Sequence, residues 1–185
     1  MIISDRKVLD SKDFSFLQSY LYARRAGIIP YLIDKTGKTF VLLGLSNEKT
    51  PLWGDLGGRS ESNPAKKSYE TVLETAIREY GEESRHVLPI FDKNISLIVI
   101  TSSSDNKGVS RFLHDQVILF VEVDPTEYNV NINKEFTKTI PKDQYEDEMT
   151  LLKWIPYNRF LSGYIDKNNL SPTLLAVIKS LKDSA

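Results

Sequence analysis

The chain has 185 residues, of which 41% are hydrophobic and 26% charged, and its formal net charge is -1 at pH 7. This length and composition suit one globular domain with a full core, and they exclude a mostly disordered, collagenous or coiled-coil chain. The near-neutral charge provides no overall attraction to nucleic acid or to an anionic membrane. The lack of cysteine excludes disulfides, thiolate catalysis and Cys-based metal sites.

The N-terminal region has no apolar core of the kind found in a secretory signal. No apolar run approaches the roughly 20 residues that a membrane-spanning helix needs. We therefore expect a cytoplasmic protein without a membrane partner. Residues 1–25 are predicted to form an N-terminal cover segment, in which Phe14–Arg25 is either a short helix or irregular.

A β-hairpin is predicted after this segment. The apolar runs Ile28–Ile33 and Phe40–Leu45 flank the turn residues Asp34–Lys38, where Gly37 can adopt a positive φ. Pro30 lacks a backbone N–H, so it predicts an edge strand or a bulge in the first run.

The next segment, Ser46–Pro64, is predicted to be a loop because it is rich in Gly, Pro, Ser and Asn. A helix is predicted from about Ser68 to Ser84. Its apolar residues recur every three or four positions, which is the pattern of an amphipathic helix. They are Val72, Leu73, Ala76, Ile77 and Tyr80.

The rest of the chain is predicted to supply three more strands and a last helix. The strands are Asn94–Ser102, Arg111–Val123 and Met149–Ile155, and residues 124–148 are expected to form a long surface loop because they lack periodicity. Ser171 and Pro172 suit the start of a C-terminal helix over residues 171–183. This order of elements indicates an α+β or mixed α/β fold in a single domain, residues 1–185.

Three glutamates of the predicted helix have a spacing that suggests a metal site. Glu79, Glu82 and Glu83 are spaced i, i+3 and i+4, so their carboxylates can converge, although like charges at this spacing repel. Hard divalent cations such as Mg²⁺ prefer oxygen ligands of this kind and would relieve the repulsion. The alternative interpretation is a solvated acidic face, since glutamate is a good helix former.

The surrounding residues resemble the signature of the Nudix hydrolases, G-x5-E-x7-R-E-U-x-E-E-x-G-U, where U is a bulky aliphatic residue. Its E-x7-R-E-x-x-E-E portion is matched by Glu70, Arg78, Glu79, Glu82 and Glu83. The upstream stretch Leu52–Glu61 is similar to the family's W-x-x-P-G-G-x-x-E lead-in. It has Trp53 in register, Leu56 in place of proline, and the pair Gly57 and Gly58. The similarity covers most of residues 26–160.

The chain departs from the signature at several positions. Eleven residues separate Gly58 from Glu70, where the family has five, so the loop carries an insertion of six. Arg85 stands where the signature has glycine, which removes an easy left-handed end for the helix. His86 and Tyr80 replace aliphatic residues. In the family an earlier glutamate supports the signature arginine; here either Glu70 or Glu74 can pair with Arg78.

The resemblance implies a Nudix-like α/β/α sandwich with a mixed sheet and an enzyme that cleaves a pyrophosphate bond in a nucleoside diphosphate derivative. It implies Mg²⁺ or Mn²⁺ as cofactor, Arg78 as the residue that orients a ligand carboxylate, and Glu82 or Glu83 as catalytic base. Some members take this base from a later loop, which makes Glu146 and Glu148 weaker candidates. The implied metal ligands are Glu79, Glu82, Glu83 and the backbone carbonyl of Gly58. The candidate substrate-binding residues are Trp53, Arg59 and, more weakly, Arg25.

Other functions stay open at this level. One is a Nudix fold that binds a nucleotide or a protein partner without hydrolysis, and another is an unrelated α+β binding module with an acidic surface helix. Among substrates, the sequence leaves nucleoside triphosphates, dinucleoside or sugar diphosphates, ADP-ribose and the 5′ cap of RNA. Lys66 and Lys67 in the inserted loop are candidates for contact with capped RNA. A homodimer is also left open.

Overall fold

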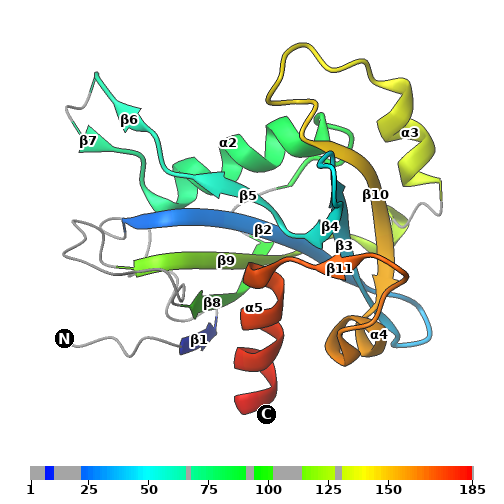
Figure 1. Ribbon diagram of the computed structural model, residues 1–185. Coiled ribbons are helices and arrows are strands. Elements are labelled where there is room, and N and C mark those ends of the chain that lie inside the picture. The colour runs from blue at the N-terminus through cyan, green and yellow to red at the C-terminus, as the bar shows by residue number, and fades with distance from the viewer. Residues whose placement is uncertain are drawn as a thin grey trace.

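The computed structural model describes residues 7–10, 22–65, 68–90, 94–101, 114–127 and 131–184, without the side chains of residues 7–10, Asn63 and His114. Nine strands in these ranges form one mixed sheet with the order β1–β8–β9–β2–β3–β4–β11, where β5 also pairs with β2 and β10 with β3 (Figure 1). They are β1 (Lys7–Asp10), β2 (Ala23–Ile33), β3 (Thr39–Ser46), β4 (Leu52–Gly54), β5 (Leu56–Arg59), β8 (Ile95–Thr101), β9 (His114–Glu122), β10 (Met149–Pro156) and β11 (Asn169–Leu170).

Helices cover both faces of this sheet. Helix α2 (Val72–Ser84) packs on one face against β2 and β5, and α5 (Pro172–Asp183) lies on the opposite face with α4 (Tyr157–Ser162) near the end of β10 (Figure 1). The short helix α3 (Ile132–Lys138) packs beside β10 and follows a single 3₁₀ turn, η3 (Pro125–Glu127). The predicted α/β/α sandwich with a mixed sheet is therefore confirmed.

The alternation of side chains along β2 explains why the sheet needs cover on both faces. Ile28 and Leu32 belong to the core on the α2 side, whereas Ile29 and Tyr31 pack into the core on the α4 and α5 side. Successive residues of a strand point to opposite faces, so a strand that is apolar at both sets of positions is stable only between two layers.

The predicted hairpin is present as β2 and β3, and Gly37 in its turn has a φ of 84°. The edge position expected for Pro30 is wrong, because β2 lies inside the sheet with β9 along one side. On its other side β2 pairs with β5 up to Ile28 and with β3 from Tyr31 onward. Pro30 falls between these two antiparallel stretches. The missing N–H is tolerated there because β2 has no antiparallel partner at Pro30 to which it could donate.

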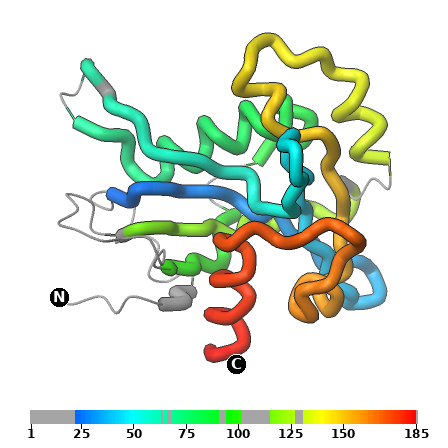
Figure 2. The backbone as a smooth tube through the Cα atoms, in the orientation of Figure 1, coloured from blue at the N-terminus to red at the C-terminus, as the bar shows by residue number. Residues whose placement is uncertain are grey.

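The helix predicted to begin at Ser68 begins later. Ser68 and Tyr69 form β7, which pairs with β6 (Ser62–Asn63) in a small separate sheet, and Figure 2 follows the backbone from β5 through this pair to α2. Thr71 then caps α2, since its Oγ1 accepts a hydrogen bond from the N–H of Glu74. The inserted residues thus extend the hairpin arm before the helix, and a local cap decides where the helix starts.

The long surface loop predicted for residues 124–148 is also corrected. It contains η3 and α3, and Ile132 and Phe136 of α3 are buried in the core on the α2 side. The helix has seven residues, too few for its i, i+4 apolar pair to stand out as a period. Tertiary packing of these two side chains, rather than helix propensity, therefore stabilises α3.

Both ends of the chain contribute to the sheet or its cover. Within the segment predicted as N-terminal cover, β1 pairs with β8, and residues 23–25 already belong to β2. Most of the segment predicted as Phe14–Arg25 lies outside the described residues. At the other end, Ser171 caps α5 through a bond from the N–H of Leu174. Of the helices in the described ranges, none has the length and apolar character to cross a membrane.

Candidate metal centre

Three carboxylates converge where α2 passes the start of β10. Oxygen atoms of Glu79, Glu83 and Glu148 all lie within 4.8 Å of one another. Glu79 and Glu83 are one helical turn apart on α2, so they project from the same face, while Glu148 comes from the residue before β10. Like charges this close repel one another unless a positive charge or a bound proton compensates them. An oxygen-rich, anionic group of this kind fits a hard divalent cation.

Glu83 is the buried member of this group. It is 4% exposed, and its Oε2 accepts a hydrogen bond of 2.7 Å from the N–H of Gly57. Burial, together with the nearby Asp55 carboxylate, raises the pKa of Glu83 well above its ordinary value. The fold thus holds an acidic group in a place where its charge is costly, which is typical of functional sites.

Glu79 is held against the β5 backbone. Burial raises the pKa of Glu79, against the opposing effect of the neighbouring Arg78 guanidinium. A Cβ added at Gly58 would overlap the Glu79 carboxyl group, so only glycine leaves room for it. Gly57 is equally constrained, because its Cβ would meet the backbone of Gly27 on the paired strand β2. The two glycines therefore let α2 and β2 approach β5 closely.

We expect Gly58→Ala to displace the Glu79 carboxylate and weaken Mn²⁺ binding about tenfold or more, since supporting contacts of a ligand carry that order of affinity. The φ of Gly58 suits alanine, so the free energy of unfolding should change by no more than about 1 kcal/mol. Calorimetric Mn²⁺ titration and urea unfolding measure the two effects. Gly54→Ala, whose Cβ meets only ordinary contacts, is the matched control. Equal Mn²⁺ affinity in both variants would contradict the prediction.

Arg78 is bound by the glutamate eight residues before it. Its Nε and one Nη donate to the two carboxylate oxygens of Glu70 at 2.7 and 3.0 Å, a bidentate pair. Burial by itself would raise the pKa of Glu70, but hydrogen bonds from Arg78 and the N–H of Glu61 hold it below its usual value. Glu74 instead accepts a bond from the hydroxyl of Thr71 at the start of α2. The structure therefore selects Glu70 as the partner of Arg78.

The second Nη of Arg78 fixes the glutamates next to it. It donates to Glu79 at 2.8 Å and to Glu82 at 3.2 Å. Glu82 is directed toward Arg78 and, among the described residues, is not one of the three whose oxygens converge. On a helix Glu82 lies about 60° from Glu79 and about 100° from Glu83. Glu82 borders the group nevertheless, because its charge adds to the burial that raises the pKa of Glu148.

Arg25 lies beside this group but is already bound. Its two Nη atoms donate to both carboxylate oxygens of Asp55 at 2.8 and 3.0 Å, and one also donates to the carbonyl of Gly57. Burial opposes the charge of Arg25, yet Asp55 holds the pKa of Arg25 above its usual value. In the structure, the guanidinium of Arg25, which was predicted to contact substrate, is engaged in this ion pair. Sequence reasoning missed Asp55, although an acid between apolar residues just before a Gly–Gly pair is a signal for such a role.

Trp53 is 1% exposed, and its Nε1–H donates to Asp166 at 2.8 Å. The ring is enclosed in the core on the α4 and α5 side and has no open face for a nucleobase in this structure, which argues against the predicted substrate contact of Trp53. Arg59 is exposed at the end of β5, and its carbonyl accepts a bond from Arg78. Lys66 and Lys67 lie outside the described residues.

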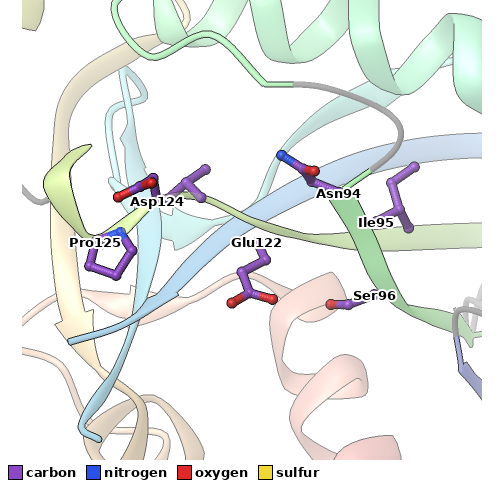
Figure 3. Close-up of a pocket in the computed structure, with 7 residues that line it drawn as sticks. Asn94, Ile95, Ser96, Glu122, Asp124 and Pro125 are labelled. Atoms are coloured by element: carbon purple, nitrogen blue, oxygen red, sulfur yellow. The ribbon is translucent and has the colours of Figure 1, made fainter. Parts of the chain in front are cut away.

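Glu146 is not part of the group either. It is buried, and its Oε2 accepts a bond from the N–H of Lys142 within the loop before β10. A separate pocket of about 500 Å³ lies between the start of β8 and the end of β9. Figure 3 shows its labelled residues, among them Ser96, Glu122 and Asp124. None of its described lining residues belongs to the converging carboxylates.

Solved structures of similar shape include Nudix hydrolases. One is RenU, a Nudix hydrolase from M. smegmatis; the match covers 89% of this chain and 87% of RenU, with a TM-score of 0.52 and 14% sequence identity. An Ap4A hydrolase from C. elegans matches 88% and 96% with a TM-score of 0.45 and 15% identity. A provisionally assigned Nudix hydrolase from Listeria monocytogenes matches 86% and 94% with a TM-score of 0.46 and 16% identity. Neither a scan against protein-family models nor a search of the curated proteins finds a match.

The match to the M. smegmatis Nudix hydrolase defines the class of fold. The chain has the Nudix hydrolase fold, with its sheet between helical layers and with the carboxylates of α2 facing β5 and β10. The predicted Nudix resemblance is thereby confirmed at the level of the fold.

Proposed function

We propose that this protein is a divalent-metal-dependent hydrolase that cleaves a pyrophosphate bond in a nucleoside diphosphate derivative by attack of water at phosphorus. The observation that carries the proposal is the convergence of Glu79, Glu83 and Glu148 within 4.8 Å on a Nudix fold. Burial raises the pKa of each of these carboxylates, so their negative charges are disfavoured in the metal-free protein. A role in binding a cation accounts for that arrangement.

Glu79, Glu83 and Glu148 would hold Mg²⁺ or Mn²⁺, with Glu82 and the Gly58 carbonyl as further candidate ligands. Such an ion, when bound, neutralises the charge of a diphosphate and lowers the pKa of water. Arg78 fixes the Glu79 carboxylate, and the N–H of Gly57 fixes that of Glu83. These contacts keep the ligand oxygens in place before substrate arrives, which reduces the cost of reorganisation.

Glu148 is the member of the group best placed to accept a proton. It is exposed, whereas Glu79 and Glu83 are partly or fully buried, so water reaches it most directly. In the metal-free protein, burial and the charge of Glu82 raise the pKa of Glu148. Glu148 would hold the ion through one carboxylate oxygen, and we propose its other oxygen as the general base, with Glu82 as the other candidate.

The test is a product screen by mass spectrometry with Mg²⁺ or Mn²⁺. The panel contains nucleoside triphosphates, sugar diphosphates, ADP-ribose, capped RNA and Ap4A, the compound for which the C. elegans structure is named. We expect wild type to release products of pyrophosphate cleavage from at least one compound, and we expect this to require the added metal. Glu79→Gln is the inactive comparison.

Two outcomes bear on the proposal. Turnover by wild type but not by Glu79→Gln supports it and identifies the substrate class. Absence of turnover across the panel, from a folded protein that binds one of the nucleotides, would favour a Nudix fold that binds without hydrolysis. Cleavage of capped RNA would make nucleic acid a substrate despite the net charge of -1.

A further inference from the structure

Arg85 ends α2 in a conformation that arginine rarely adopts. Its φ is 51° and its ψ 32°, in the left-handed region, and its N–H bonds to the carbonyls of Gly81 and Glu82. Glycine adopts this conformation without strain, so a non-glycine residue needs a compensating contribution from its side chain.

The side chain of Arg85 is buried and fully engaged. It is 7% exposed, and its guanidinium donates to four backbone carbonyls at 3.0 to 3.3 Å. Its plane also lies over the ring of Phe136, 4.0 Å from the centroid. The four acceptors belong to Phe136, Thr139, Glu146 and Met149. A buried arginine bound this way joins the end of α2 to both ends of the loop that connects α3 with β10.

Two of these acceptors lie on either side of Glu148. The Nε of Arg85 binds the carbonyl of Glu146, and one Nη binds that of Met149. Arg85, which follows the last residue of α2 and lies two positions after Glu83, therefore binds the backbone on both sides of Glu148. A separate contact, from the N–H of Asn47 to the carbonyl of Glu148, supports the same segment.

We propose that Arg85 is a positioning residue that holds Glu148 against Glu79 and Glu83. The proposal rests on the proposed function only in treating these carboxylates as one metal centre. Arg85 supplies rigidity between α2, which carries two of the carboxylates, and the loop, which carries the third. A lysine cannot replace it, since one ammonium group cannot reach four carbonyls spread around a planar guanidinium.

The test compares Arg85→Gly and Arg85→Lys with wild type. Glycine fits the left-handed conformation, so Arg85→Gly removes the side-chain contacts and keeps the helix end. We expect it to weaken Mn²⁺ binding by about 10- to 100-fold in calorimetric titration. We expect Arg85→Lys to weaken Mn²⁺ binding to a similar extent. His86→Gly, at the neighbouring exposed residue with a φ of 57°, is the matched control and should keep wild-type affinity.

A double substitution separates positioning from general damage. If Arg85 acts through Glu148, Arg85→Gly should cause no further loss of Mn²⁺ affinity in a Glu148→Gln background. Additive losses, or wild-type affinity in Arg85→Gly, would overturn the proposal.

Hydrogen exchange of the metal-free protein tests the same contacts without a ligand. We expect faster exchange over residues 142–149 in Arg85→Gly than in His86→Gly, and equal exchange there would overturn the proposal. If wild type binds no Mn²⁺, the proposed function fails, while hydrogen exchange still decides whether Arg85 holds the segment that carries Glu148.

Discussion

Glu83→Gln is expected to lower the rate of hydrolysis by orders of magnitude. The Tm of the metal-free protein should equal or exceed that of wild type. Glutamine keeps an oxygen that can accept the N–H of Gly57, so the local hydrogen bond survives. It removes the charge that burial and Asp55 make costly. Activity assays and thermal unfolding with and without Mn²⁺ measure the two effects. We expect the Mn²⁺-dependent rise in Tm to disappear.

The same variant has a definite pH signature. The pKa of Glu83 is higher in the folded chain than the ordinary value of 4.5, so the folded state binds this proton more tightly. The free energy of unfolding of the metal-free protein should therefore fall as pH rises from about 4.5 through the folded-state pKa. Glu83→Gln should remove that decline.

Glu74→Gln makes the same chemical change on the same helix, outside the converging carboxylates. It should retain near wild-type activity and its Mn²⁺-dependent rise in Tm. Full activity in Glu83→Gln, or a metal-free Tm well below that of Glu74→Gln, would show that Glu83 serves the fold rather than a metal centre.

Asp55→Ala is expected to destabilise the protein by about 3 kcal/mol, the low end for breaking a buried ion pair, because it leaves the half-buried Arg25 guanidinium without its carboxylate. Asp55 is 2% exposed, and its pair with Arg25 connects β2 to the residue before β5. Gly27 permits this arrangement, since a Cβ there would overlap the Asp55 carboxylate. Urea unfolding of the metal-free protein gives the measurement.

A double-mutant cycle gives the control for this pair. Arg25→Met with Asp55→Ala should lose less stability than the sum of the two single changes, because no charge is then left buried alone. Additivity within about 0.5 kcal/mol would mean that the two side chains do not stabilise one another.

Much of the architecture could be predicted from local patterns. Apolar runs on either side of a Gly-containing turn predicted β2 and β3, and the spacing of Glu79 and Glu83 put both on one face of α2. These features depend on neighbours within one element or across one turn, where the geometry is fixed by the backbone. Two errors fall where tertiary contacts decide: Pro30 lies in an interior strand, and α3 is a buried helix. The third, the late start of α2, follows from the local cap at Thr71.

Some residues of the candidate site could be predicted from the sequence, and others could be placed only by the tertiary structure. The sequence by itself determined the E-x7-R-E-x-x-E-E pattern and the α2 carboxylates, because helical geometry converts spacing into direction. Only the tertiary structure shows that Glu70 is the partner of Arg78 and that Glu148 lies next to Glu79 and Glu83. It also enclosed Trp53 and engaged Arg25 with Asp55. These contacts join residues far apart along the chain, so their distances depend on how the whole sheet and its helices pack.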